Sequence, residues 1–242
     1  MANHSTEVTD ASGKVLAVHA PCATKPVLTN PFLNSSNSPN GGSPSGGSWV
    51  EDATFNEYYF TGFSAQWNVP APPSSYGNQI IYLFPGLEPI FGDSIIQPVL
   101  QWGSSSYGSG QYYVMADWYF SILSGAYHTP FIKVNSGDTI GGFMAESSGP
   151  GSSWTVGFAD VTTQKGNAMG VSGIYETQAF VTLEQYNVQS CSQYPNTWYY
   201  GIPFSSVQDQ SGHTGSWNTQ INLHGCGEFV STYPNYVNLG ID

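Results

Sequence analysis

The sequence predicts an all-β protein, a two-sheet antiparallel β-sandwich of the jelly-roll type. Short apolar or alternating runs recur from Trp49 onward, and Gly, Pro, Asn and Ser separate them. This is the pattern of strands and turns. No stretch shows a long apolar repeat of 3.6 residues bounded by helix caps. The close spacing of many short strands favours a sandwich or jelly roll.

The expected strands follow one another closely along the chain. They cover residues 57–66, 79–84, 94–102, 112–122, 131–134, 139–145, 154–160, 176–186, 202–209, 219–223 and 229–231. We expect one domain over residues 49–242, preceded by a flexible leader and linker over residues 1–48. Residues 30–48 are mostly Pro, Gly, Ser and Asn, which is typical of a linker. Residues 1–29 could be the remnant of a propeptide, an extension that packs on the domain, or a disordered segment.

The charge balance excludes two classes of partner. The 242 residues include four lysines, no arginine and sixteen carboxylates, for a net charge of -12. Nucleic-acid phosphates and anionic membrane surfaces both attract basic residues, so neither is an expected partner. We expect a monomer that binds a peptide, a glycan or a small molecule. We also expect an extracellular protein, although the N-terminus shows no signal peptide.

The cysteines predict one disulfide and no metal site. Cys191 and Cys226 could form a disulfide around a long loop, which would leave Cys22 in the leader. No cysteine pair has the spacing of metal ligands, and the five histidines form no metal-binding motif. We therefore expect no metal and no cofactor. Two glycosylation sequons, at Asn3 and Asn34, also fall in the leader.

Alternation assigns side chains to the two faces of two strands. In the strand over 176–186, Ala179, Val181 and Leu183 should face the core, and Glu176, Gln178, Phe180 and Glu184 should share the other face. In the strand over 94–102, Gln97 and Gln101 share one face. We expect these two strands to be neighbours that present their polar faces to one hollow.

Several motifs, in the order in which they occur, resemble those of the glutamic peptidases, the eqolisin family. They are FSAQWNVP at 63–70, IYLFPGLE at 81–88, IIQP at 95–98, DWYF at 117–120, VNSGDTI at 134–140, SWTV at 153–156, DVTT at 160–163 and QAFVTLE at 178–184. The resemblance covers about residues 54–210. It implies two curved sheets with a concave groove for an extended peptide. It also implies catalysis at acid pH, in which a glutamate acts as general base on a water molecule and a glutamine amide stabilises the oxyanion.

The sequence departs from this family at the catalytic pair. Gln97 matches the family's glutamine, but Pro98 follows it. The position of the catalytic glutamate falls on Phe180, or on Ala179 in a second alignment, and a further groove glutamate is matched by Phe120. None of these side chains can move a proton.

Three interpretations remain open. A shifted carboxylate, Glu184 or Glu176, could act with Gln97; the groove could bind a glycan or peptide without cleaving it; or it could serve other chemistry on a small apolar or aromatic molecule. For an enzyme, the candidate catalytic residues are Gln97, Glu184, Asp117 and Glu176. Asp117 is included because an acid among aromatic residues can have a raised pKa.

The candidate binding residues combine aromatic rings and amides. They are Trp67, Gln101, Trp118, Phe120, Gln178 and Phe180. Trp154 is a further candidate, although a tryptophan in such a fold is more often part of the core. The aromatic loop YPNTWYY at 194–200 is expected either to form a wall of the groove or to cover a sheet edge.

Overall fold

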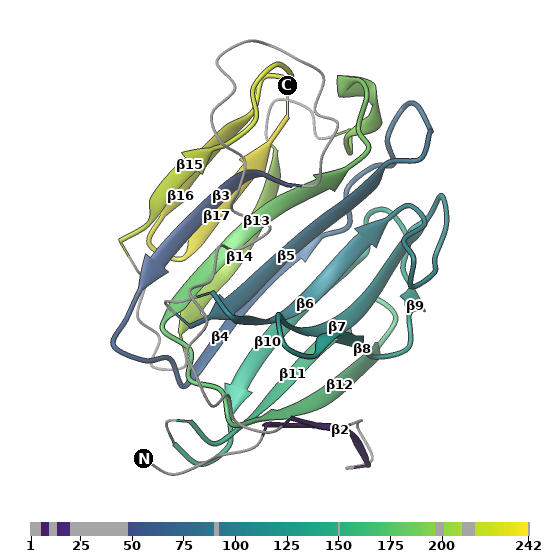
Figure 1. Cartoon of the computed structure of the whole chain (residues 1–242). Helices are drawn as coiled ribbons and strands as arrows, with labels where there is room; N and C mark the ends of the chain where they lie inside the picture. Colours follow the sequence, from purple (N-terminus) through teal and green to yellow (C-terminus); the bar gives the residue numbers. More distant parts are fainter. Residues whose placement is uncertain are drawn as a thin grey trace.

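Two antiparallel sheets form a β-sandwich, which confirms the predicted fold class. The computed structural model describes residues 6–9, 14–19, 48–89, 92–149, 151–196, 201–209 and 216–241. In this part of the chain, sheet A has nine strands in the order β16 (Phe229–Tyr233), β17 (Tyr236–Gly240), β14 (Ile202–Asp209), β4 (Gly62–Asn68), β10 (Thr139–Glu146), β11 (Ser153–Asp160), β12 (Lys165–Ser172), β1 (Thr6–Thr9) and β2 (Val15–His19). Sheet B has eight described strands: β15 (Asn218–Ile221), β3 (Ser48–Asn56), β13 (Gln178–Tyr186), β5 (Ile80–Glu88), β6 (Ser94–Trp102), β7 (Tyr113–Ser121) and β8 (Gly125–His128), with β9 (Ile132–Lys133) paired to β7. Figure 1 shows β3, β13, β5, β6 and β7 side by side in one layer.

The main core lies between the sheets. Sheet B contributes Ile96 and Leu100 of β6, and sheet A contributes Trp67 of β4 and Val156 of β11 to the same buried cluster. A second buried cluster contains only residues of sheet B: Phe84, Val99, Ala116, Trp118 and Phe180. It lies on the face of sheet B turned away from sheet A, which we call the outer face.

Strands with a clear apolar pattern occur where the sequence predicts them. The bounds of β6 and β14 agree with the prediction, at 94–102 and 202–209. The strand expected over 57–66 instead begins at Gly62, and Tyr58, with 85% of its surface exposed, lies before it. Strands β3, β8, β12 and β17 were not predicted. The sequence of β12, KGNAMGVS, has little apolar alternation to reveal a strand.

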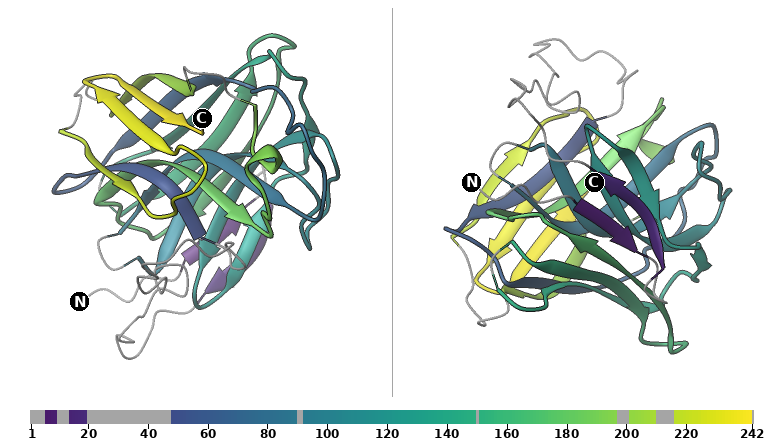
Figure 2. Two further views of the ribbon diagram at one scale, coloured as in Figure 1. Left: turned by 90° about the horizontal axis from the view of Figure 1, so that it is seen from above. Right: turned by 60° about the horizontal axis from the view of Figure 1, so that its bottom comes forward.

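Part of the expected leader pairs with sheet A. β1 and β2 form an antiparallel pair, and Val8 and Thr9 of β1 pair with Val171 and Gly170 of β12. Figure 2 shows this pair, in purple, at the edge of the sheet. The division into a leader over 1–48 and a domain over 49–242 stays a prediction. Several positions considered in the sequence lie outside the described residues. They are both glycosylation sequons, at Asn3 and Asn34, Cys22, the histidines His4 and His213, the rest of residues 20–47, and residues 197–200 of the aromatic loop.

The predicted disulfide is confirmed. Cys191 and Cys226 are bonded, with their Cα atoms 5.3 Å apart. Cys191 begins the short 3-10 helix η1 (Cys191–Gln193), and Cys226 lies between β15 and β16. The bond therefore ties the segment after β13 to the last part of the chain.

Candidate functional site on the outer face of sheet B

One row of residues crosses the centre of the outer face. Gln97 of β6 pairs with Trp118 of β7. On the other side, Leu87 pairs with Ile96 and Leu83 with Leu100, which sets Gly86 of β5 opposite Gln97. Gly86 in turn pairs with Phe180 of β13.

Gln97 and Phe180 therefore share one face and one row, as the sequence predicted. The expectation that their strands are neighbours is wrong, because β5 lies between β6 and β13. The intervening residue is a glycine, so no side chain separates Gln97 from the position of Phe180.

The ring of Phe180 fills the space above that glycine. A Cβ atom on Gly86 would lie 2.1 Å from Cζ of Phe180. The ring also contacts Trp49, at a centroid distance of 4.7 Å, and the edge of Phe84, at 5.9 Å. Phe180 is fully buried. The side chain in the row of Gln97 is thus the buried apolar ring of Phe180, and no acid occupies this position.

Gln97 and Trp118 each have an unpaired polar atom. Oε1 of Gln97 and Nε1 of Trp118 are both buried, and neither has a hydrogen-bond partner. Trp118 is 6% exposed, and Gln97 is half-buried. Directly paired side chains on one face of a sheet have Cβ atoms about 4.5–5.5 Å apart. One acceptor and one donor on neighbouring side chains are therefore buried without partners, which is costly unless a ligand or water binds them.

Among the acids of the outer face, the closest to Gln97 by strand register is Glu88. On β5 it stands two residues from Gly86, on the same face, so it is diagonal to Gln97 at about 7–8 Å between Cα atoms. Burial, and then the charge of Asp52, raise the pKa of Glu88 to about 7. The sequence prediction missed Glu88, although its alternation with Gly86 and Phe84 would have placed it on this face.

Glu184 lies on the same face but far from Gln97. It pairs with Tyr82, which pairs with Gln101, four residues beyond Gln97 on β6. The separation is about 13 Å along the strands and about 10 Å across them. Burial raises the pKa of Glu184 to about 7, while a hydrogen bond of 2.7 Å from the Tyr186 hydroxyl acts in the opposite direction. The structure does not bring the expected pair together.

Asp117 lies on the opposite face of sheet B. It pairs with Pro98 and alternates with Ala116 and Trp118 of the outer face, so its side chain is directed toward sheet A. Burial raises its pKa to about 8, and the Thr129 hydroxyl donates to Oδ2 at 3.3 Å. The raised pKa agrees with the prediction, but the position separates this acid from Gln97.

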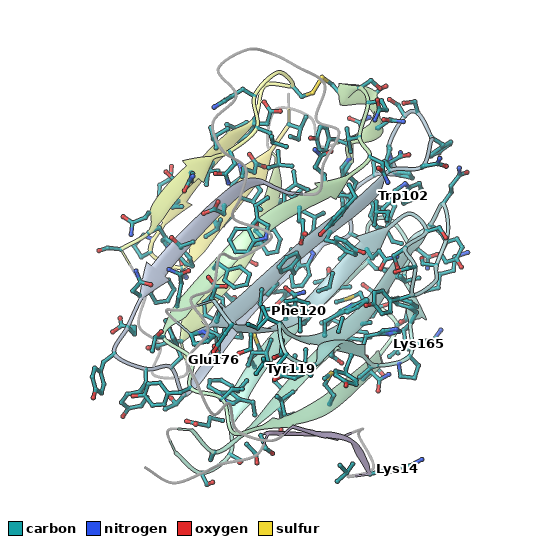
Figure 3. The ribbon with its side chains drawn as sticks, viewed as in Figure 1. Lys14, Trp102, Tyr119, Phe120, Lys165 and Glu176 are labelled. Carbon is teal, nitrogen blue, oxygen red and sulfur yellow. A yellow bond between two sulfur atoms is a disulfide. The ribbon has the colours of Figure 1, made fainter. Side chains whose placement is uncertain are left out.

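Glu176 is buried just before β13. Neither of its carboxyl oxygens has a hydrogen-bond partner. Burial, and then the charges of Glu88 and Asp93, raise its pKa well above the usual value. Figure 3 shows Glu176, Tyr119 and Phe120 at the same end of the sandwich, and Glu176 also raises the pKa of Tyr119 after the larger effect of burial. Burial and the nearby carboxylates therefore disfavour the charged form of Glu176.

The predicted binding residues divide between the outer face and other places. Trp118, Phe120, Gln178 and Phe180 lie on the outer face, where Gln178 donates to Asn56 at 2.8 Å. The assignment of Trp67 to a groove is wrong, because this side chain is buried between the sheets and stacks on Phe204 at 4.9 Å. Trp154 is buried there too.

Gln101 has a structural role. Its Nε2 donates to the carbonyl oxygens of Gly103, at 2.8 Å, and Gly108, at 3.2 Å. These bonds fix the loop between β6 and β7. Its Oε1 is buried without a partner.

A second aromatic group borders the face at β8. The His128 ring lies between Trp118, at 4.5 Å, and Phe131, at 4.7 Å, and Tyr107 meets its edge at 5.5 Å. Nδ1 of His128 lies 2.7 Å from the carbonyl oxygen of Thr129.

The described residues contain no group of three or more His, Cys, Asp or Glu side chains that could hold a metal ion. No helix in the described part of the chain is long and apolar enough to cross a membrane.

Comparison with solved structures defines the class of fold. The chain is similar to scytalido-glutamic peptidase bound to a peptide-based transition-state analogue, with a TM-score of 0.58 and 17% identity over 83% of this chain and 100% of that one. It is also similar to SCP-B, a member of the eqolisin family, in complex with the tripeptide Ala-Ile-His, with a TM-score of 0.56 and 17% identity over the same shares of the two chains. No protein-family model and no curated protein matches the chain.

The protein therefore has a glutamic peptidase-like fold, which confirms the resemblance seen in the sequence. The comparison shows the fold, and the residues of the outer face determine which activity this fold can carry.

Proposed function

We propose that the outer face of sheet B binds an extended peptide without cleaving it. The observation that carries this proposal is the Phe180 ring above Gly86, in the row of Gln97. Peptide hydrolysis of the glutamic type needs a carboxylate there that can take and return a proton. A phenyl ring supplies only apolar contact.

The chemistry of the face suits a peptide. An extended peptide offers an N–H donor and a C=O acceptor at each unit, which match the unpaired Gln97 Oε1 and Trp118 Nε1; both atoms are buried, so the two side chains would have to turn toward the peptide to bind it. Half-buried apolar side chains, Ile95 and Phe120, flank this row and would contact the side chains of the peptide. The two similar structures contain peptide-type ligands, which supports this choice of ligand by analogy.

The carboxyls of the face argue against hydrolysis at acid pH. Burial, as the largest cause, raises the pKa of Asp52 to about 6 and those of Glu88 and Glu184 to about 7. These groups are protonated in acid, where a general base must be ionised. We further propose that the protein works outside the cell, because a disulfide persists in oxidising compartments.

A second candidate function is hydrolysis by Gln97 with Glu88. The diagonal position of Glu88 favours it, and its raised pKa would make this reaction fastest near or above neutral pH. Both candidates can be tested with one set of proteins: the full chain, Gln97→Ala, Glu88→Gln, and the control Gln66→Ala, at an exposed glutamine of β4 in sheet A.

The experiment measures binding to a peptide array and cleavage of the same peptides by mass spectrometry between acid and weakly alkaline pH. We expect saturable binding, intact peptides, and an affinity about 2–10-fold weaker in Gln97→Ala, since one hydrogen bond contributes about 0.5–1.5 kcal/mol. Cleavage that is lost in Glu88→Gln would establish the second candidate in place of the first. Saturable binding to a glycan array with no binding to peptides would also contradict the proposal that the outer face binds a peptide.

A further inference from the structure

A cavity lies at the end of the sandwich where β5 begins and β6 ends. Its volume is about 330 Å³, within the range of small-molecule sites, and its lining includes Asn78, Gln79, Trp102, Ser104, Gln111 and Asn187. Trp102 is five residues beyond Gln97 on β6, or about 17 Å, so the cavity is separate from the row of Gln97. Figure 3 shows Trp102 at the upper right of the view, away from Phe120 near the centre and Glu176 at the lower left.

The wall of the cavity is fixed by internal bonds. Gln79 is 2% exposed; its Oε1 accepts the N–H of Gly77 at 2.6 Å, and its Nε2 donates to the carbonyl oxygen of Ser75 at 3.0 Å. Gly103 has a φ of 93°, and a Cβ there would lie 2.1 Å from the backbone oxygen of Gln79. A glycine permits both this backbone conformation and this close approach, which brings the loop after β6 against the start of β5 in the wall of the cavity.

The lining combines apolar and polar groups, and its side chains carry no charge. Asn78, Ser104 and Gln111 are exposed, and none of their side chains bonds to another side chain of the described residues. Asn187 donates from Nδ2 to the carbonyl oxygen of Asn78 at 3.4 Å, which leaves its Oδ1 to accept. Amides and a hydroxyl can both donate and accept, as the hydroxyl groups of a sugar require.

An aromatic ring completes the lining. Trp102 stacks on Tyr76 at 5.8 Å, meets the edge of Tyr113 at 4.9 Å, and is held in one orientation by these contacts. The indole itself is only 4% exposed, so the apolar surface for the C–H face of a pyranose is the ring of Tyr76, which is 55% exposed, stacks on Trp102 and precedes Gly77 of the lining. An ionic ligand would find no opposite charge in this lining.

We propose that this cavity binds a neutral carbohydrate, one or two rings of an uncharged glycan. The site is independent of the outer face, so it does not rest on the peptide-binding proposal.

The test is calorimetric titration of the full chain with neutral hexoses, N-acetylhexosamines and their disaccharides, and with a uronic acid. We expect saturable binding of at least one neutral sugar and weaker binding of the uronic acid. The double variant Asn78→Ala/Gln111→Ala, at two exposed positions, should weaken binding about tenfold. Gln66→Ala and Gln97→Ala should leave it unchanged.

Three outcomes would overturn the proposal. The first is that no neutral sugar binds to the folded full chain. The second is that a sugar binds with an affinity that Asn78→Ala/Gln111→Ala leaves intact. The third is that Gln97→Ala abolishes sugar binding, which would assign the sugar to the outer face.

Discussion

The Phe180 ring and Gly86 occupy one continuous space on the outer face. The ring lies where the side chain of any other residue at position 86 would extend, with Cζ 2.1 Å from the position of its Cβ. Because Phe180 is fully buried, it cannot move aside without disturbing Trp49 and Phe84. A side chain at position 86 is therefore compatible with the fold only if residue 180 is also replaced by a smaller one.

The first prediction is that Gly86→Ala destabilises the protein by about 1–3 kcal/mol, the usual cost of overpacking. The measurement is urea unfolding followed by tryptophan fluorescence. Gly141→Ala is the matched control, because the nearest atom to its Cβ is Ala65 O at 3.8 Å. It should change the free energy of unfolding by less than about 0.5 kcal/mol.

A double-mutant cycle tests the cause of that loss. Phe180→Ala alone should cost about 3–5 kcal/mol, because it leaves a cavity in a buried cluster. In Gly86→Ala/Phe180→Ala the new methyl group enters that cavity, so the double variant should lose less than the sum by about 0.5–3 kcal/mol. Strict additivity would show that the ring and the glycine do not share this space.

The second prediction is that stability falls as pH rises from acid through neutral. The folded pKa values are raised to about 6 for Asp52, about 7 for Glu184, about 8 for Asp117 and about 9 for Glu51, with burial the largest cause in each. An acid with a raised folded pKa stays protonated in the native state while the unfolded chain ionises. Its contribution is fully present below the unfolded pKa of about 4 and is lost as pH rises through the folded pKa. Each such group contributes a slope of up to about 1.4 kcal/mol per pH unit.

Thermal and urea unfolding between acid and weakly alkaline pH measure this slope. Glu51→Gln should flatten the profile most at its upper end, because burial and the charge of Glu228 give Glu51 the highest of these four pKa values. Glu57→Gln, at an exposed position, is the matched control and should leave the slope unchanged. A stability maximum above neutral pH would contradict the assignment of neutral, buried carboxyls.

The composition of a strand decides how much of this site the sequence could reveal. β13 alternates small or aliphatic residues with polar ones, so the face shared by Phe180 and Glu184 could be predicted. The face of Asp117 could not be predicted in the same way. β7 is buried on both faces, with Met115 and Tyr119 on one and Trp118 on the other, so no polarity contrast marks the inner side.

The order of strands in the sheet also limited what could be predicted from the sequence. The sequence placed Gln97 and Phe180 on comparable faces but gave no sign that β5 lies between their strands, because pairing order depends on contacts across the whole chain. The register of β5 is also what reveals Glu88 as the diagonal neighbour of Gln97. Trp67 was misplaced for a similar reason, since only the packing of β4 against sheet B shows that it faces the core.

The third prediction separates Asp117 from the outer face. Asp117→Asn replaces a carboxyl that is neutral up to a pH of about 8 by a neutral amide of the same shape. Stability at pH 4 should change little, while at pH 8 the variant should be more stable than the parent by more than about 1 kcal/mol. Unfolding at the two pH values measures the difference, and peptide binding measured alongside should be unchanged. A loss of binding in a variant of normal stability would place Asp117 in the site.

The fourth prediction concerns the bond between Cys191 and Cys226. The two residues are 35 positions apart, and β14 and β15 lie between them in the chain. Cross-linking a loop of this length restricts the unfolded chain, so the bond should stabilise the fold by about 3–4 kcal/mol. Cys191→Ser/Cys226→Ser should lose that amount in urea unfolding, and so should the parent protein treated with a reductant. The double variant treated with the same reductant is the control and should show no further loss, because no other described cysteine remains to be reduced. Equal stability of the oxidised and reduced parent would mean that the segment after β13 is held to the end of the chain without the disulfide.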